Sequence, residues 1–137
     1  MRIALTRQFR AEIGRCQLTH LERRPIDVER ARRQHDAYED ALRVCGVVVY
    51  QLPEAPDLPD AVFVEDAAVV VAELAVVTRP GAASRRPEVV TVAEALSRWR
   101  SVMRIEPPGT LDGGDVLVTG RRVWVGRSSR TNQDGIE

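Results

Sequence analysis

The sequence contains no lysine, so all 20 of its basic residues are arginines. They are balanced by 20 aspartates and glutamates, which gives a formal net charge of zero. Without an excess of positive charge there is no long-range field to attract nucleic acid or an anionic membrane surface, and we expect neither as a partner. The longest apolar stretch, Ala61–Val77, is interrupted by Glu65, Asp66 and Glu73. A membrane span is therefore not expected.

Cysteine is also scarce, because the chain has only Cys16 and Cys45. Two cysteines are too few for a disulfide scaffold, and a reducing cytoplasm is the expected compartment. Met1 leads directly into a strand-like segment, so no secretory signal is recognised. Cys45 ends the apolar stripe of an expected helix and is predicted to be packed, as is His35 on the same stripe. Cys16 lies in a polar loop and is the only cysteine with a claim to reactivity.

A length of 137 residues fits one domain, and 44% hydrophobic with 29% charged residues is typical of a globular protein. Alternating or β-branched apolar runs predict strands. Prolines and acids at first turns, followed by apolar residues three and four apart, predict helices. The strands are expected at 2–7, 47–52, 67–72, 75–78, 102–105, 116–119 and 123–126, with helices beginning at 25–27 and 87–88. The first helix carries the stripe Ala31, His35, Tyr38, Leu42 and Cys45, and Gly46 is its expected left-handed stop. The fold class is therefore α/β.

An internal repeat is the strongest architectural signal. The segments FVEDAAVVVAELAVVTRP and LDGGDVLVTGRRVWVGRS both run from an acid through a strand, a tight turn and a second strand to an arginine. Glu65 and Asp112, the acids of the two segments, lie 47 residues apart. Repeats of this length stack to bury cores that one unit cannot bury alone. We therefore expect a partner, with strand residues such as Val123 and Val125 exposed without it.

Two acidic motifs carry candidate chemistry. Glu65 and Asp66 lie between apolar runs, where burying carboxylates is costly unless a cation meets them. That cation is either the guanidinium of a ligand or one of the chain's own arginines. In LDGGD, the glycines let the backbone approach closely and deliver Asp112 into a cleft, where it binds a cation or orients a histidine. The alternative is a bulge before a hairpin, with Asp115 bonding its own backbone.

Two further points concern ligands of these motifs. The acids are too spread out for a hard-cation loop, so no metal site is expected. Arg85, Arg86 and Arg130 follow the two hairpins and are either surface groups or bidentate partners for a ligand carboxylate.

Seven elements taken in order resemble one known family. They are QLTH, QHDAY, LPDAVFVED, VVTRPGAASRRPE, PPGTLDGGDVL, VGRSSRTN and the final Gly-Ile, and they cover essentially the whole chain. Together they are similar to the dimethylarginine dimethylaminohydrolases. Arginine deiminases and amidinotransferases share the acid pair and the GGD element, but RPGAASRRPE and RTN favour the dimethylaminohydrolase branch. The resemblance implies a pentein-like fold, a five-bladed α/β-propeller of ββαβ modules. Residues 1–137 would form a single incomplete domain of about half that propeller.

The resemblance also implies a site. Asp112 corresponds to the acid of the catalytic triad, which holds the histidine. Glu65 and Asp66 correspond to the acids that hold the substrate guanidinium. The remaining implied substrate-binding residues are Leu18 on the lid, Asp60 near the α-amino end, and Arg85 and Arg130 around the amino-acid end.

In this family a cysteine thiolate attacks the guanidinium carbon, an alkylamine leaves, and a histidine helps water to release citrulline, without metal or cofactor. Both partners lie downstream of RTN in the family, and His20, His35, Cys16 and Cys45 occupy neither position. We therefore expect this chain alone to be inactive, and to act on methylated arginine only when a C-terminal half chain completes it. As partners we expect a second copy of the chain, in a homo-oligomer, or that C-terminal half chain. The alternatives are a non-catalytic module that binds arginine-like ligands or oligomerises, and half of an arginine deiminase or amidinotransferase relative.

Overall fold

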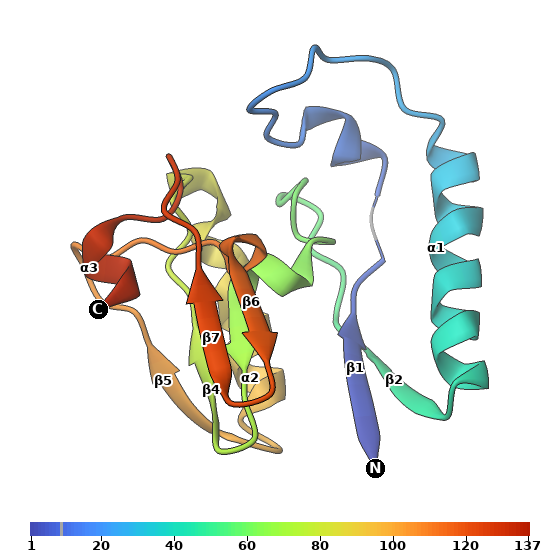
Figure 1. Cartoon of the computed structure of the whole chain (residues 1–137). Coiled ribbons are helices and arrows are strands. Elements are labelled where there is room, and N and C mark those ends of the chain that lie inside the picture. Colours follow the sequence, from blue (N-terminus) through green and yellow to red (C-terminus); the bar gives the residue numbers. More distant parts are fainter. Residues whose placement is uncertain (9) are drawn as a thin grey trace. The chain divides into compact units, whose positions relative to one another are not determined.

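The computed structural model of the chain describes residues 1–8 and 10–137 (Figure 1). These residues divide into two compact units, Met1–Val62 and Phe63–Glu137, and each is described by itself. The expectation of one domain concerns both units together and stays a prediction. Within the described residues, no helix combines the length and the apolar character that crossing a membrane requires.

The first unit is built on a β-α-β arrangement. Strands β1 (Arg2–Thr6) and β2 (Val47–Gln51) pair in parallel, in register from Arg2 opposite Val47 to Thr6 opposite Gln51. Parallel strands need a crossover, and helix α1 (Val28–Val44) supplies it. The carboxylate of Asp27 caps the helix by accepting the N–H of Arg30 at 2.9 Å. The helix stops at Gly46, whose φ of +74° confirms the predicted left-handed residue.

The inward line of α1 differs from the predicted stripe. It runs through Ala31, His35 and Leu42, which are half-buried, and the fully buried Glu39. The predicted members Tyr38 and Cys45 are exposed, so the prediction that Cys45 is packed was wrong. The physical reason is a polar network around Glu39, which turns this side of the helix toward the strands. No hydrophobic periodicity signals a buried glutamate.

That network surrounds the Glu39 carboxylate with donors. Thr6 Oγ1 donates to it at 2.7 Å, Gln51 Nε2 at 3.1 Å and Arg43 at 3.1 Å. Burial alone would raise the pKa of Glu39, but the hydrogen bonds from Thr6, Gln51 and Arg43 outweigh it and hold the pKa below its usual value. Glu39 is therefore ionised at neutral pH and ties α1 to both strands.

A short 3-10 helix, η1 (Ala11–Arg15), interrupts the segment predicted to be a polar loop. The residue after it, Cys16, is buried, although the sequence predicted a polar loop around it. Ile13, in η1, is also buried, and its carbonyl accepts the N–H of Cys16 at 3.0 Å. The polar residues that neighbour Cys16 along the chain gave no sign of this burial.

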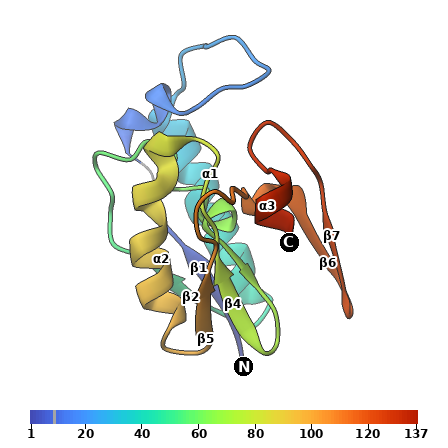
Figure 2. The ribbon, with the colours of Figure 1, turned by 90° about the vertical axis from the view of Figure 1, so that its left-hand side faces the viewer.

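The second unit contains a three-stranded sheet and a separate hairpin. In the sheet, β3 (Ala68–Val70) pairs antiparallel with β4 (Leu74–Val77), which pairs in parallel with β5 (Ser101–Arg104). Helix α2 (Val89–Leu96) provides the crossover and packs on this sheet, as Figure 2 shows. The hairpin consists of β6 (Val116–Thr119) and β7 (Arg122–Val125), with its turn at the predicted Gly120–Arg121.

Four elements of the second unit were not predicted. Three are short 3-10 helices: η2 (Val64–Ala67), η3 (Ala83–Glu88) and η4 (Gly113–Asp115). The fourth is the last helix, α3 (Gln133–Ile136), whose cap Asn132 accepts the N–H of Gly135 at 2.8 Å. Pro87 and Glu88, predicted to open the second α-helix, belong instead to η3, the turn before it.

The two hairpins confirm the internal repeat but correct its alignment. Ala68 lies opposite Val77 in the first hairpin, and Val116 lies opposite Val125 in the second. The strands are thus related by an offset of 48 residues rather than the 47 that separate Glu65 and Asp112. By register, Asp112 corresponds to Val64. The repeat is in the strands, and the two acids are not equivalent.

Candidate functional site

The two acidic motifs of the second unit meet in space. The N–H of Gly114 donates to Asp66 Oδ1 at 2.8 Å. At Gly113 the backbone passes so close to the carbonyl of Glu65 that no Cβ would fit. This close approach is the use of the paired glycines that the sequence predicted. It fixes LDGGD against the acid pair.

Asp66 is neutralised from within the chain. Its Oδ2 accepts from Arg85 at 2.7 Å, and the same guanidinium pairs with Glu88 at 3.0 Å. Arg85 is only 4% exposed and lies 5.9 Å from the centre of the Phe63 ring. Burial alone would lower the pKa of Arg85, but Glu88 and Asp66 outweigh it and raise the pKa further above its usual value. The sequence left two cations open for the acid pair, the guanidinium of a ligand or one of the chain's own arginines. For Asp66 the cation is an arginine of the chain, Arg85.

Glu65 is arranged differently from its neighbour. Its side chain is exposed, and it makes no hydrogen bond or ion pair with any other residue that the structure describes. A carboxylate of this kind can meet an external cation without first breaking an internal pair. Glu65 is therefore the member of the acid pair that is open to a ligand.

Asp112 is a buried carboxylate with fixed orientation. The N–H of Gly81 donates to its Oδ1 at 2.9 Å, and Arg130 donates to its Oδ2 at 3.2 Å. Its own N–H donates to Thr131 Oγ1 at 3.2 Å. A carboxylate offers about four acceptor positions, so two remain beyond those that the described residues fill. Asp112 can therefore accept a further N–H, such as that of an imidazole.

The segment after the second hairpin supports Asp112. Asp115 accepts from Ser128 Oγ and from Thr131 Oγ1, each at 2.6 Å. The alternative prediction, that Asp115 bonds its own backbone, was wrong, because these two hydroxyls hold its carboxylate. Thr131 is fully buried. Sequence reasoning did not single out Thr131 or Gly81, although the RTN motif contains the first and VVTRPGAASRRPE contains the second.

The remaining two site residues, Leu18 and Asp60, lie in the first unit. Asp60 is buried, and both of its oxygens accept the N–H of Gln17, at 2.9 and 3.1 Å. Gln17 directly precedes Leu18, which is 39% exposed. Asp60 thus anchors the loop that carries Leu18. The loop was predicted, and its anchor was not.

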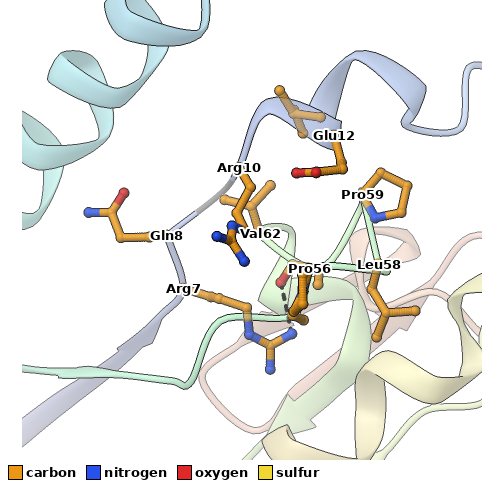
Figure 3. Close-up of a pocket in the computed structure, with 11 residues that line it drawn as sticks. Arg7, Gln8, Arg10, Glu12, Pro56, Leu58, Pro59 and Val62 are labelled. Carbon is orange, nitrogen blue, oxygen red and sulfur yellow. Dashed lines mark hydrogen bonds between the residues drawn. The ribbon is translucent and has the colours of Figure 1, made fainter.

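A cavity in the first unit lies below the size of a ligand site (Figure 3). Its volume is about 10 Å³, which suffices for about one water molecule. Arg7 lies at its edge and donates to the carbonyl of Ala61 at 3.2 Å. This cavity is too small to hold a substrate.

The sequence of this chain is similar to that of one known protein family over almost its whole length. The profile of the family described as N,N dimethylarginine dimethylhydrolase, eukaryotic, matches residues 6–137. The N(G),N(G)-dimethylarginine dimethylaminohydrolase of Streptomyces coelicolor is 46% identical over 135 residues, which are 98% of this chain and 52% of the relative. The protein of the same name from Pseudomonas aeruginosa is 42% identical over 111 residues, covering 80% of this chain and 44% of the relative. The chain therefore spans about half the length of the curated relatives it matches.

Solved structures agree with the sequence relatives. A mutant of the Pseudomonas aeruginosa enzyme, complexed with citrulline, superimposes with a TM-score of 0.92 at 37% identity. That match covers 98% of this chain and 53% of the other. The N-terminal domain of ArgZ superimposes with a TM-score of 0.84 at 22% identity, covering 96% of this chain and 51% of the other, and supports the fold alone.

The α/β modules and these neighbours define a protein of the α/β pentein fold. Within that class, the chain belongs to the dimethylarginine dimethylaminohydrolase family.

Proposed function

We propose that residues 1–137 form the N-terminal part of an amidinohydrolase that converts N-methylated arginine to citrulline and an alkylamine. The observation that carries this proposal is Asp112, which is buried, held by Gly81 and Arg130, and able to accept one more N–H. An acid so placed can fix the tautomer and orientation of a catalytic histidine. The citrulline-bound structure of a relative supports the product class.

The fold that we propose is an incomplete α/β-propeller. One ββαβ module is complete in the second unit, since α2 and β5 follow the β3–β4 hairpin. The β6–β7 hairpin is two-stranded and exposes large apolar side chains on both faces, including Leu117, Val118, Val123 and Trp124. Exposed apolar side chains and unpaired strand edges favour association. The partner that we propose is a C-terminal half chain, with homo-oligomerisation as the second choice.

We propose the roles of the site residues from the family resemblance, and the contacts within each unit support several of them. Glu65 grips the substrate guanidinium, and Asp66 supports it from its fixed position beside Gly114. Arg130, whose side chain is 24% exposed, reaches toward the substrate carboxylate while it holds Asp112. The role of Arg85 at the amino-acid end stays a prediction, and its pairing with Asp66 and Glu88 favours a positioning role. Leu18 closes over the substrate on a loop that Asp60 anchors.

The reaction balances with one water. A cysteine thiolate forms a bond to the guanidinium carbon, and a protonated histidine gives its proton to the alkylamine nitrogen. The neutral alkylamine then leaves, and a cationic thiouronium intermediate remains. A histidine takes a proton from water, whose oxygen displaces the thiolate to give citrulline. The sequence from Phe63 to Glu137 contains neither histidine nor cysteine. The unit that holds Asp112 therefore needs both groups from elsewhere.

Complementation tests this function. Purified chain 1–137 is incubated with N,N-dimethylarginine, alone and with the half of the Streptomyces coelicolor relative that it does not cover. Citrulline and dimethylamine are then assayed. We expect no turnover by the chain alone and turnover by the mixture. Turnover by the chain alone that Cys16→Ser abolishes would contradict the proposal. Ligand binding without turnover in a stable mixture would favour the non-catalytic module.

A further inference from the structure

A cluster of arginines in the second unit takes no part in the arrangement around Asp66 or Asp112. It lines a cavity of about 220 Å³ that is partly open to solvent, between the ends of β4 and β5 and the start of α2. Arg79, Arg86 and Arg104 line this cavity together with a single acid, Glu106. Three positive charges less one negative charge leave a net charge of +2. A cavity with this balance attracts an anion.

Two of these arginines are held in place by backbone carbonyls. Arg79 donates to the carbonyl of Gly109 at 3.1 Å, and Arg86 donates through Nε to the carbonyl of Pro80 at 3.2 Å. Both side chains are half-buried. Each bond uses one of the five N–H donors of a guanidinium and leaves the rest for a ligand. Among residues 1–8 and 10–137, no acid forms an ion pair with Arg79, Arg86 or Arg104. Their charge is therefore not neutralised internally.

We propose that this cavity binds a compact dianion of the phosphate class. Its volume is below the roughly 300–1,000 Å³ of pockets that take drug-sized ligands, so a small ion fits the space better than an extended ligand. Guanidinium groups bind tetrahedral oxyanions through paired N–H donors, and two charges on the ion neutralise the net charge of the walls. Glu106 stands at one wall and disfavours an ion large enough to reach it.

The site is joined to Asp112 through the backbone. The carbonyl of Arg79 accepts the N–H of Leu111 at 2.9 Å, directly before Asp112. Two residues after Arg79, the N–H of Gly81 donates to the Asp112 carboxylate. An anion that orders Arg79 and Arg86 therefore restrains the same segment that holds Asp112. The amide signal of Gly81 provides a readout independent of turnover.

Inorganic phosphate is the probe. The melting temperature of chain 1–137 and its ¹H–¹⁵N spectrum are followed during titration with sodium phosphate, against sodium chloride at matched ionic strength. Arg104 is exposed, and its side chain bonds none of residues 1–8 and 10–137, so Arg104→Gln should leave the fold intact. Arg121→Gln, in the exposed β6–β7 turn, is the matched control. We expect saturable stabilisation with a shifted Gly81 signal, and affinity about tenfold weaker for Arg104→Gln but unchanged for Arg121→Gln.

Three outcomes would overturn the proposal. In the first, sodium chloride at matched ionic strength stabilises the chain as much as phosphate does. In the second, Arg104→Gln and the parent chain respond to phosphate alike. In the third, citrulline or acetate competes with phosphate at equal concentration, which would make the cavity a carboxylate site rather than a phosphate site.

Discussion

Asp66 and Asp112 are held in the same way but in different surroundings. Each accepts the N–H of a glycine and the guanidinium of an arginine that follows a hairpin. Arg85, the partner of Asp66, is buried and shared with Glu88. The side chain of Arg130, the partner of Asp112, is 24% exposed. The first arrangement is a closed ion-pair cluster that fixes structure, while the second keeps an arginine accessible beside a carboxylate with spare acceptor positions. This difference supports the proposal that Asp112 is the acid that takes part in the chemistry.

The largest loss of stability is expected from a substitution in the closed ion-pair cluster of Arg85, Asp66 and Glu88. Arg85→Gln leaves the buried carboxylate of Glu88 and the half-buried carboxylate of Asp66 without their cation, and breaking a buried pair in this way costs about 3–5 kcal/mol. Arg130→Gln removes a partly exposed partner and should cost about 1–2 kcal/mol. Urea unfolding of the two variants measures both values. Equal losses would remove the distinction between the two arrangements.

The contact between the two arrangements depends on Gly113. Because a Cβ at this position would overlap the carbonyl of Glu65, Gly113→Ala forces LDGGD away from the acid pair. We expect a loss of about 2–3 kcal/mol in the free energy of unfolding. Gly126→Ala is the control, since a Cβ there meets its nearest atom at an ordinary 3.6 Å. A Gly113→Ala chain as stable as the Gly126→Ala chain would show that the motifs do not meet so closely.

The buried carboxylate of Glu39, in the first unit, extends the comparison to acid pH. The pKa of Glu39 is lowered in the folded chain, so the stability that it contributes is fully present above the ordinary pKa that it has when unfolded. That contribution is lost as pH falls through the lower, folded pKa. Thr6→Val removes one donor to Glu39 and should cost about 1 kcal/mol at pH 7, with a smaller difference from the parent at acid pH. A cost that does not change with pH would exclude Glu39 as its source.

The smallest change in the free energy of unfolding is expected from a substitution on the exposed β6–β7 hairpin. Leu117 is 60% exposed in this chain, so Leu117→Ser should change its free energy of unfolding by about 0.5 kcal/mol or less. If a C-terminal half chain covers β6–β7, the same variant should weaken that complex clearly more than Arg121→Gln does. Sedimentation of the mixed halves measures this difference. Equal binding by both variants would place the contact elsewhere.

The sequence predicted most of the regular elements, because periodicity and turn residues are local signals. Examples are strands β1 and β2, helix α1 with its stop at Gly46, and the β6–β7 turn. It also indicated that the GGD motif approaches other backbone closely. Partners distant in sequence were not predictable in the same way. Nothing near Arg85 selects Asp66, 19 residues away, and nothing near Asp60 selects the N–H of Gln17, 43 residues away. Such pairings are set by tertiary packing, as are the buried Cys16 and the exposed Cys45.

The most direct test of the central claim is the turnover of the complemented halves with Asp112→Asn in chain 1–137. Asparagine keeps the shape of the side chain but removes the charge that orients a histidine. We expect kcat for N,N-dimethylarginine to fall by roughly 10³–10⁴-fold, the order seen when a triad acid is neutralised, while KM changes little. Asp66→Asn should cost only one to two orders of magnitude. A complemented Asp112→Asn enzyme that retains the parental kcat would contradict the account.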